Sequence, residues 1–263
     1  IAGEKLKEND GIIGIYSVKD GVGKSTVALN LAGYYKEMSP ETRVLLLDLD
    51  SQFSSIRNFT NRNIGLSKIS LGESVFKNDR EVYKSNKTGL FISPSSNMEK
   101  PEEIVDMLKS LKKHFDMIII DIASEINDST LTALNCISNL FIVSDNRTYI
   151  KEATAYFAKE GASNLGLRIP EPHIVMNKSS KIESSSFENR YKLKAAGYIE
   201  PDNEIYEYEE RKLIYSLGNK KSSLNDCMEI LNKKQRKSFK ISSNRKGFLN
   251  AKRSKGSYRH RKP

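Results

Sequence analysis

Residues 19–26, with the sequence KDGVGKST, are the part of the chain best suited to hold phosphate groups. Two glycines let backbone N–H groups turn inward around anionic oxygens. Lys24 adds a positive charge, and the Ser25 hydroxyl can ligate Mg²⁺ at a helix N-terminus, which itself attracts anions. The generic phosphate-loop pattern requires Gly six residues before the lysine, where this chain has Val18. The segment therefore predicts a phosphate-binding loop of a variant type.

Two aspartates follow apolar runs elsewhere in the chain. Asp50 lies in the block LDLDSQ, in which the second predicted strand ends, and Asp121 directly follows the run MIII. Carboxylates at strand ends beside a phosphate loop are suited to hold the water ligands of Mg²⁺ or to orient an attacking water. Either aspartate alone could instead cap a helix. The combination with the loop favours the catalytic interpretation.

Short apolar runs alternate with longer amphipathic stretches along most of the chain. The predicted strands are 12–17, 43–47, 90–93, 117–120, 140–143 and 173–176. The predicted helices are 26–35, one that begins at Pro101, 130–137, 150–159 and 224–232. This alternation predicts an α/β fold: a doubly wound, mostly parallel sheet with helices on both faces. In such sheets ligands bind outside the carboxyl ends of the strands, where the phosphate loop is expected.

Composition excludes several classes of protein. The chain has 263 residues, 38% hydrophobic and 29% charged, and its apolar runs are far shorter than a membrane helix requires. Two cysteines, Cys136 and Cys227, cannot form a disulfide framework, so a cytoplasmic location is expected. The three histidines have unrelated spacings and form no metal-ligand pattern. Because the first residue is Ile1, we expect residues 1–10 to be a linker from a longer chain.

Charge divides the chain into two unequal parts. Residues 232–263 contain 13 Lys and Arg and no Asp or Glu, which leaves 30 basic and 33 acidic residues in 1–231. The few apolar residues of the basic segment are too scattered to build a core, so 232–263 is expected to be a disordered basic tail behind a folded domain of 11–231. Such a tail attracts polyanions, namely nucleic acid, an anionic membrane surface or an acidic partner.

These motifs together resemble the ParA/MinD family of deviant phosphate-loop ATPases over residues 11–231. The resemblance is carried by Lys19, five residues before Lys24, by the strand and aspartate block at 44–52, and by the strand that ends at Asp121. Weaker similarities are the strand end MNK at 176–178 and the segment 198–217.

The resemblance implies specific roles for these residues and the cofactors ATP and Mg²⁺. Lys19 would reach the phosphates of a second subunit, Lys24 the bound phosphates, and Asp50 would orient the hydrolytic water. Ser25 would ligate Mg²⁺, and Asp121 would hold it through water. Asn177 would contact adenine. The full implied nucleotide-binding set is Lys19, Asp20, Gly21, Val22, Gly23, Lys24, Ser25, Thr26 and Asn177.

Two positions depart from the family pattern. Asp20 stands where the family has Gly after the signature lysine, and its carboxylate either obstructs a nucleotide-bridged dimer or turns outward. After Asp121 the chain continues IASE without the proline that the family commonly has there. Nucleotide binding is therefore expected, with slow turnover.

Three functional hypotheses follow from the resemblance, all with an ATP-bound homodimer and a cargo-adaptor or hydrolysis-stimulating partner. The first is DNA partition, with sequence-independent DNA binding aided by the basic tail. The second is a CpaE/TadZ-like localisation factor for pilus or secretion-system assembly with little turnover, which Asp20 and the non-Met start favour. The third is a MinD-like membrane switch, although the apolar face near Phe248 is short. Bacterial tyrosine kinases share the loop but usually end in a tyrosine cluster, and this tail has only Tyr258.

Overall fold

The computed structural model describes residues 11–51, 54–71, 80–95, 100–219 and 221–235. One nine-stranded sheet runs through it in the order β3-β4-β5-β2-β6-β1-β7-β8-β9. The strands are β1 (Ile12–Tyr16), β2 (Val44–Asp48), β3 (Leu66–Ile69), β4 (Val82–Ser85), β5 (Phe91–Ser93), β6 (Met117–Asp121), β7 (Asn139–Ser144), β8 (Pro172–Asn177) and β9 (Ala195–Ile199). All neighbours from β5 to β9 pair in parallel, whereas β3–β4 and β4–β5 are antiparallel.

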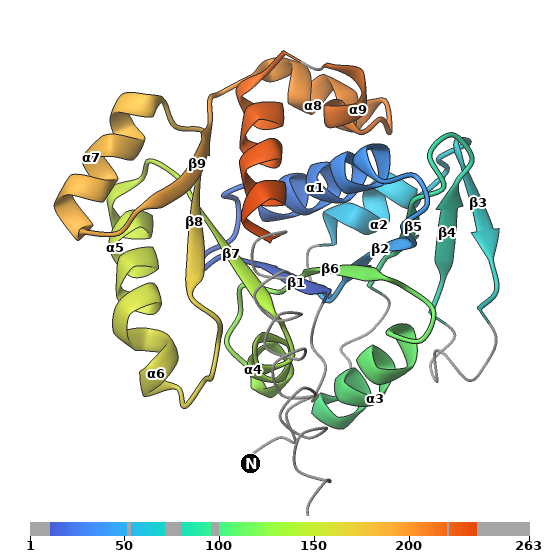
Figure 1. The fold of residues 1–263 in the computed structure, drawn as a ribbon, viewed down its shortest axis with the longest axis horizontal. Helices are drawn as coiled ribbons and strands as arrows, with labels where there is room; N and C mark the ends of the chain where they lie inside the picture. Colours follow the sequence, from blue (N-terminus) through green and yellow to red (C-terminus); the bar gives the residue numbers. More distant parts are fainter. Residues whose placement is uncertain (1–10, 52–53, 72–79, 96–99, 220, 236–263) are drawn as a thin grey trace, which may run out of the picture.

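Helices cover both faces of this sheet (Figure 1). They are α1 (Lys24–Met38), α2 (Ser55–Thr60), α3 (Pro101–Leu111), α4 (Asp128–Asn135), α5 (Thr148–Tyr156), the π-helical turn η1 (Phe157–Gly161), α6 (Ala162–Asn164), α7 (Lys181–Tyr191), α8 (Asn203–Glu210) and α9 (Tyr215–Gly218). Residues 223–235 form a further helix, drawn in orange-red beside α1 in Figure 1. The predicted fold class is therefore confirmed.

The inner strands β1, β2, β6 and β7 are mostly apolar, because they are buried on both sides. On one face Ile13 and Ile15 of β1 pack with Val27 and Leu31 of α1 and with the helix 223–235. On the opposite face Ile12 and Tyr16 pack against α3, α4, η1 and α7. Both hydrophobic cores meet at β1, which is thus fixed from two sides.

The position of β1 determines where a ligand can bind. β1 lies between β6 and β7, and the next neighbour beyond β6 is β2. The chain leaves β1 toward α1 on one face and leaves β6 toward α4 on the other, so the crossovers diverge at this point. Asp48 of β2 pairs in register with Asp121 of β6, which in turn pairs with Ile15 of β1. Both carboxylates and the loop after β1 therefore share one edge of the sheet, as the doubly wound topology requires.

The sequence pattern missed the antiparallel strands β3 and β4, the edge strand β9 and the helices α2, α6, α7, α8 and α9. α7 shows why, because only Ser184 and Phe187 of its eleven residues are buried. Its remaining positions are polar, so the chain carries no apolar stripe for a periodicity argument to find. β9 is short and contains small residues (AAGYI), which have weak strand preference.

The last described helix continues through residue 235. Asn232 and Gln235 are buried, and Gln235 Oε1 accepts a hydrogen bond from the Tyr35 hydroxyl of α1 at 3.2 Å. Residues 1–10 and 236–263, where a linker and most of the basic tail are predicted, lie outside the described residues. Within the described part of the chain, no helix combines the length and apolarity needed to cross a membrane.

Gly197 provides a test of how β9 packs under the helix 223–235. A Cβ atom at Gly197 would lie 2.8 Å from Cys227 Sγ, closer than real contacts allow. We expect Gly197→Ala to lower the free energy of unfolding by about 1–3 kcal/mol through overpacking. Chemical denaturation of G197A, C227A and the double variant measures the coupling. Because C227A removes the sulfur, the double variant should be more stable than the two single effects predict, and strict additivity would contradict the proposed contact.

Candidate nucleotide-binding site

The loop after β1 has the backbone conformation expected of a phosphate cradle. Gly21 and Gly23 have φ angles of 78° and 88°, in the left-handed region that glycine adopts without strain. Gly23 is the N-cap of α1 and offers no side-chain cap, which leaves the first N–H groups of that helix available for an anion. A Cβ atom at Gly23 would lie 2.2 Å from Asn177 Nδ2, so glycine is also required there for space.

Two consecutive side chains from the end of β8 hold the carbonyl groups of this loop. Asn177 Nδ2 donates to the Val22 carbonyl at 2.7 Å, and Lys178 Nζ donates to the Gly21 carbonyl at 3.2 Å. Asn177 was predicted from the sequence, and the structure brings it to the loop across 155 residues of chain. The bond to Val22 uses one of the two Nδ2 hydrogens of Asn177, and its amide oxygen is an acceptor suited to a base amino group.

Lys24 lies at the centre of the predicted site. Its Nζ is 2.7 Å from Asp121 Oδ1 and 3.4 Å from Asp50 Oδ2, and the Lys24 side chain is only 6% exposed. Burial disfavours the ammonium charge, but the carboxylates of Asp121 and Asp50 outweigh this and raise the pKa of Lys24. Asp121 Oδ2 is buried and has no hydrogen-bond partner among the described residues. The three predicted residues Lys24, Asp50 and Asp121 are therefore in direct contact.

Asp48 is a site residue that the sequence analysis did not select. It is fully buried, and its carboxylate accepts from the backbone N–H of Asp50 at 2.8 Å, from that of Ser95 at 3.3 Å and from the Ser54 hydroxyl. Arg80 joins the same network by donating a hydrogen bond to the backbone carbonyl of Asp48. Asp48 thereby fixes the turn that carries Asp50. The signal in the sequence was a carboxylate at the last position of an otherwise apolar strand.

Burial gives Asp48 an unusual titration. Loss of solvation, followed by the nearby charge of Asp121, raises the pKa of Asp48 to about 6, although its three hydrogen bonds act in the opposite direction. Asp48 thus holds the turn after β2 by accepting several hydrogen bonds, although burial disfavours its ionised form.

An open cavity of about 550 Å³ adjoins the loop, a size typical of small-ligand sites. On one side it is lined by the loop residues Asp20, Gly21, Gly23, Lys24, Ser25 and Thr26 together with Asp50. On the other it is lined by Asn177, Lys178, the segment Glu200–Asn203 and residues Ile205, Tyr206 and Glu209 of α8. The loop end offers backbone N–H groups and the Lys24 ammonium beside two carboxylates, and the other end presents amide, apolar and aromatic groups together with the carboxylates of Glu200, Asp202 and Glu209. This division matches a molecule with phosphates at one end and a planar base at the other.

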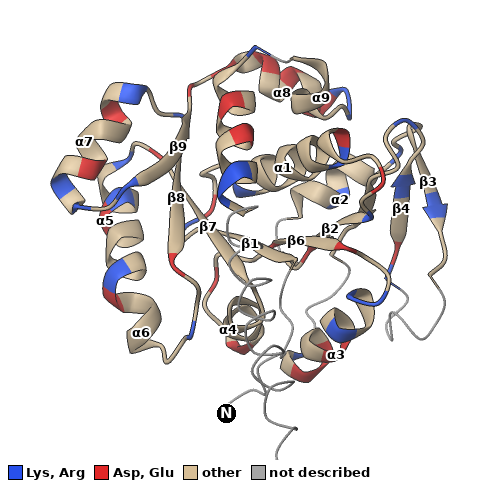
Figure 2. Ribbon diagram, in the orientation of Figure 1, with Lys and Arg blue, Asp and Glu red and all other residues tan. Residues whose placement is uncertain are grey.

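α8 carries several acidic residues (Figure 2), and one of them, Glu209, lines this cavity. Burial raises the pKa of the Glu209 carboxyl, whereas the Thr26 side chain and the charge of Lys178 act to lower it. A half-buried carboxyl near the third residue of α1 makes the α8 side of the cavity less favourable to further negative charge.

Lys19 and Asp20 occupy the exposed outer turn of the loop. The Lys19 carbonyl accepts a hydrogen bond from the Ser17 hydroxyl at 2.9 Å, and the same hydroxyl is 2.9 Å from Ser124 Oγ. Ser124 lies in the segment after β6, so the base of the outer turn is tied to that segment. Lys19 is therefore exposed to solvent on a turn whose base is held in place.

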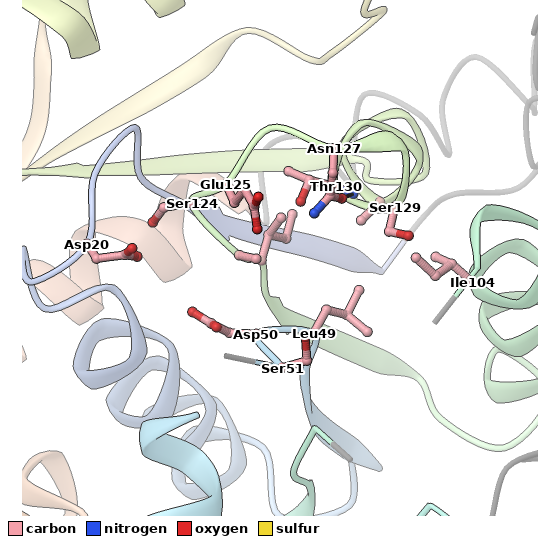
Figure 3. A pocket seen from close by; sticks show the side chains of 13 residues that line it. Asp20, Leu49, Asp50, Ser51, Ile104, Ser124, Glu125, Asn127, Ser129 and Thr130 are labelled. Carbon is pink, nitrogen blue, oxygen red and sulfur yellow. Dashed lines mark hydrogen bonds between the residues drawn. The ribbon is translucent and has the colours of Figure 1, made fainter. Parts of the chain in front are cut away.

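A second, small hollow of about 30 Å³ lies on the other side of Asp50. Figure 3 shows the side chains of Asp20, Asp50 and Glu125 around it, each supplied by the loop that follows a different parallel strand. Burial, with a further contribution from Asp20, raises the pKa of the nearby Tyr16 hydroxyl to about 12. Asp20 is exposed and shares the lining of this hollow with the carboxylates of Asp50 and Glu125.

Comparison with known proteins places the chain in a family. Residues 10–182 match the sequence profile AAA_31, described as an AAA domain. The chain belongs to this ParA/MinD family of P-loop ATPases. The predicted resemblance is thereby confirmed.

Individual relatives differ in what their names say they do. The tyrosine-protein kinase CpsD of Streptococcus pneumoniae serotype 4 is 26% identical over 199 residues, which cover 68% of this chain and 82% of CpsD. A ParA family ATPase from Chlorobium tepidum TLS has 19% identity and a TM-score of 0.68, with 83% of this chain and 97% of that chain covered. MinD from Pyrococcus horikoshii OT3, solved with Mg-ADP, has 19% identity and a TM-score of 0.67, with 84% and 93% covered. These two structures share the fold of this chain.

The residues present fit a magnesium nucleotide. The loop offers N–H groups and Lys24 to phosphates, Ser25 stands at the start of α1, and the orphaned Asp121 Oδ2 is an acceptor that a hydrated cation would satisfy. Among the described residues no group of three or more His, Cys, Asp or Glu side chains could hold a metal ion by itself. A cation would therefore need phosphate oxygens as further ligands, as is usual for Mg²⁺ in nucleotide sites.

The buried carboxylate of Asp48 predicts a pH-dependent effect of Asp48→Asn. Because the pKa of Asp48 is raised in the folded protein, its contribution to stability is greatest below its unfolded value near 4 and is lost as the pH rises through about 6. The asparagine variant has no such ionisation. The stability of wild type minus that of D48N, measured by urea denaturation, should decrease between pH 4.5 and 7.5. A difference that stays constant over this range would contradict the assigned titration.

Proposed function

We propose that this ParA/MinD family ATPase is an ATP-dependent dimerisation switch that positions DNA, as in plasmid or chromosome partition. The observation that carries the proposal is the contact of Lys24 with both Asp121 and Asp50, which joins the phosphate loop to the segments after β6 and β2. Nucleotide phosphates compete with Asp50 and Asp121 for the Lys24 ammonium. Their binding therefore weakens the contacts of Lys24 with both aspartates. A change at the phosphates is thereby passed to two surface segments.

The family resemblance supplies the proposed residue roles, and the arrangement of the site supports them. The loop from Asp20 to Thr26 holds the phosphates, Lys24 neutralises their charge, and Ser25 with Asp121, through water, holds Mg²⁺. Asp50 orients a hydrolytic water, and its turn is held by Asp48. Lys19, exposed on the outer turn, reaches the nucleotide of the second subunit, and Asn177 contacts the adenine. Bound Mg²⁺ supplies charge neutralisation at the phosphates.

The first prediction concerns the phosphate loop. Lys24→Ala should weaken MgATP binding by about 100-fold, because it removes a buried cation from the phosphate site. Isothermal calorimetry with MgATP, made well below the melting temperature of each variant, measures this. Lys159→Ala on η1 is the matched control and should bind as wild type does. Unchanged affinity of K24A would refute the assigned site.

The second prediction concerns DNA. The 13 basic residues of 232–263, without an acidic one, support binding of the DNA backbone without sequence preference. Binding of random-sequence duplex at 50 and 200 mM salt, with an ATP analogue, ADP or no nucleotide, should require the ATP analogue. It should also fall at least about tenfold with salt. Binding that is independent of nucleotide would reduce the tail to a simple polycation, and absence of binding would refute the partition role.

A CpaE/TadZ-like localisation factor with little turnover is the second candidate, and Asp20 is the feature that favours it. Its carboxylate shares a hollow with Asp50 and Glu125, on the turn that a partner subunit would approach. If Asp20 obstructs the dimer, Asp20→Gly should increase the ATP-dependent dimer fraction in sedimentation velocity. Equal sedimentation of wild type and D20G with ATP would mean that the side chain does not oppose dimerisation.

A further inference from the structure

Lys178 combines an unusual backbone conformation with an unusual contact. Its φ is 52°, in the left-handed region that non-glycine residues seldom adopt, and its side chain reaches the Gly21 carbonyl across 157 residues of chain. The Lys178 side chain also lines the 550 Å³ cavity. A sterically unfavourable backbone at a cavity wall calls for a compensating interaction.

The residues on either side force this conformation. Asn177 is held by its bond to the Val22 carbonyl, and Ser179 is fully buried, with its N–H bonded to the Ile199 carbonyl of β9 at 2.9 Å. The Ser179 hydroxyl also returns to the Asn177 carbonyl at 3.1 Å. The chain must therefore turn sharply between two fixed residues, and this turn directs the Lys178 side chain toward the loop.

Gly21 is the part of the loop that most needs an external restraint. It has a φ of 78°, and a Cβ atom built on it would meet nothing within 4 Å, so packing does not hold it. Glycine adopts positive and negative φ about equally, and the peptide that carries the Gly21 carbonyl can therefore rotate. Rotation would turn that carbonyl oxygen toward bound phosphates, where two partial negative charges would repel.

Two adjacent carbonyls are held by two adjacent side chains. Lys178 holds the Gly21 carbonyl, and Asn177 holds the Val22 carbonyl. The described residues contain no cis peptide, so the N–H groups of Val22 and Gly23 point opposite to these carbonyls. Fixing the carbonyls therefore fixes the direction of the N–H groups that a phosphate loop uses.

We propose that Lys178 is a positioning residue of the phosphate loop, which keeps the Gly21 carbonyl turned outward so that the loop binds the α- and β-phosphates of a nucleotide. This inference rests on the proposed nucleotide-binding function. It gives Lys178 control of the loop conformation at Gly21, next to the Val22 carbonyl that Asn177 holds, and gives Lys178 no contact with the base.

The test compares variants of the full chain by calorimetry with ADP and ATP in the presence of Mg²⁺. Lys178→Ala should weaken both nucleotides by a similar factor of about five to ten, because both share the α- and β-phosphates and lose the same loop restraint. Lys178→Arg should restore affinity to within about twofold, since it keeps a cationic donor. Lys178→Gly relieves the left-handed backbone but lacks the ammonium, so it should bind as weakly as K178A.

Lys192→Ala is the matched control, because Lys192 also has a left-handed backbone (φ 55°) but caps α7 away from the cavity. It should leave affinity unchanged. The melting temperature without nucleotide should be similar for K178R and wild type, which separates positioning from general destabilisation.

Three results would overturn the inference: K178A affinity within twofold of wild type, failure of arginine to restore binding, or a loss confined to ATP, which indicates direct contact with the γ-phosphate. If K178A fails to fold, K178R and K178G carry the comparison. Failure of wild type to bind either nucleotide would instead refute the proposed function.

Discussion

The site depends on one charge balance, in which Lys24 is the cation that a buried group of carboxylates requires. Asp121 and Asp50 contact it, and Asp48 lies beside them in register with Asp121. Buried charges of one sign are strongly unfavourable without a partner, so the strand ends of β2 and β6 can lie this close only while the loop after β1 supplies its lysine. The phosphate loop is thus part of what allows this edge of the sheet to form.

This constraint also explains how the two cavities are related. Asp20 and Asp50 line both the large cavity beside the phosphate loop and the small hollow next to Glu125. Phosphates that bind at Lys24 therefore also affect the small hollow, because Asp50 contacts Lys24 and lines that hollow. The hydrogen bond between the hydroxyls of Ser17 and Ser124 provides a second connection, from the start of the loop to the segment after β6.

Much of this could be predicted from the sequence, for physical reasons that differ between residues. Strands such as Val44–Asp48 and Met117–Asp121 are buried on both faces, so their apolar runs were visible, and two aspartates marked the site: Asp121 at the end of β6 and Asp50 two residues after β2. Lys24, Asp50 and Asp121 were predicted and lie in contact. Asp48 was overlooked because its partners Ser54 and Ser95 come from loops whose approach no local pattern reveals.

Other features depended on long-range contacts that sequence spacing does not encode. Lys178 adjoins the predicted Asn177, but its bond to Gly21 follows from a backbone turn fixed by Ser179 and β9. β9 and α7 escaped prediction because small and polar residues give them no periodic apolar signal. Their place in the fold is set by the strands and helices around them.

The helix 223–235 has a consequence for how the protein is made. Its residues Leu224, Cys227, Met228 and Leu231 complete the hydrophobic core that α1 shares, and Gln235 meets Tyr35 near the end of α1. During synthesis, α1 emerges from the ribosome about 200 residues before this cover, a separation equal to the 200 residues between Tyr35 and Gln235. Domains fold as units, and exposed apolar surface invites aggregation. A nascent chain therefore carries α1 with one side uncovered until nearly the whole domain has been translated. During this interval the exposed apolar side of α1 is a binding site for a chaperone.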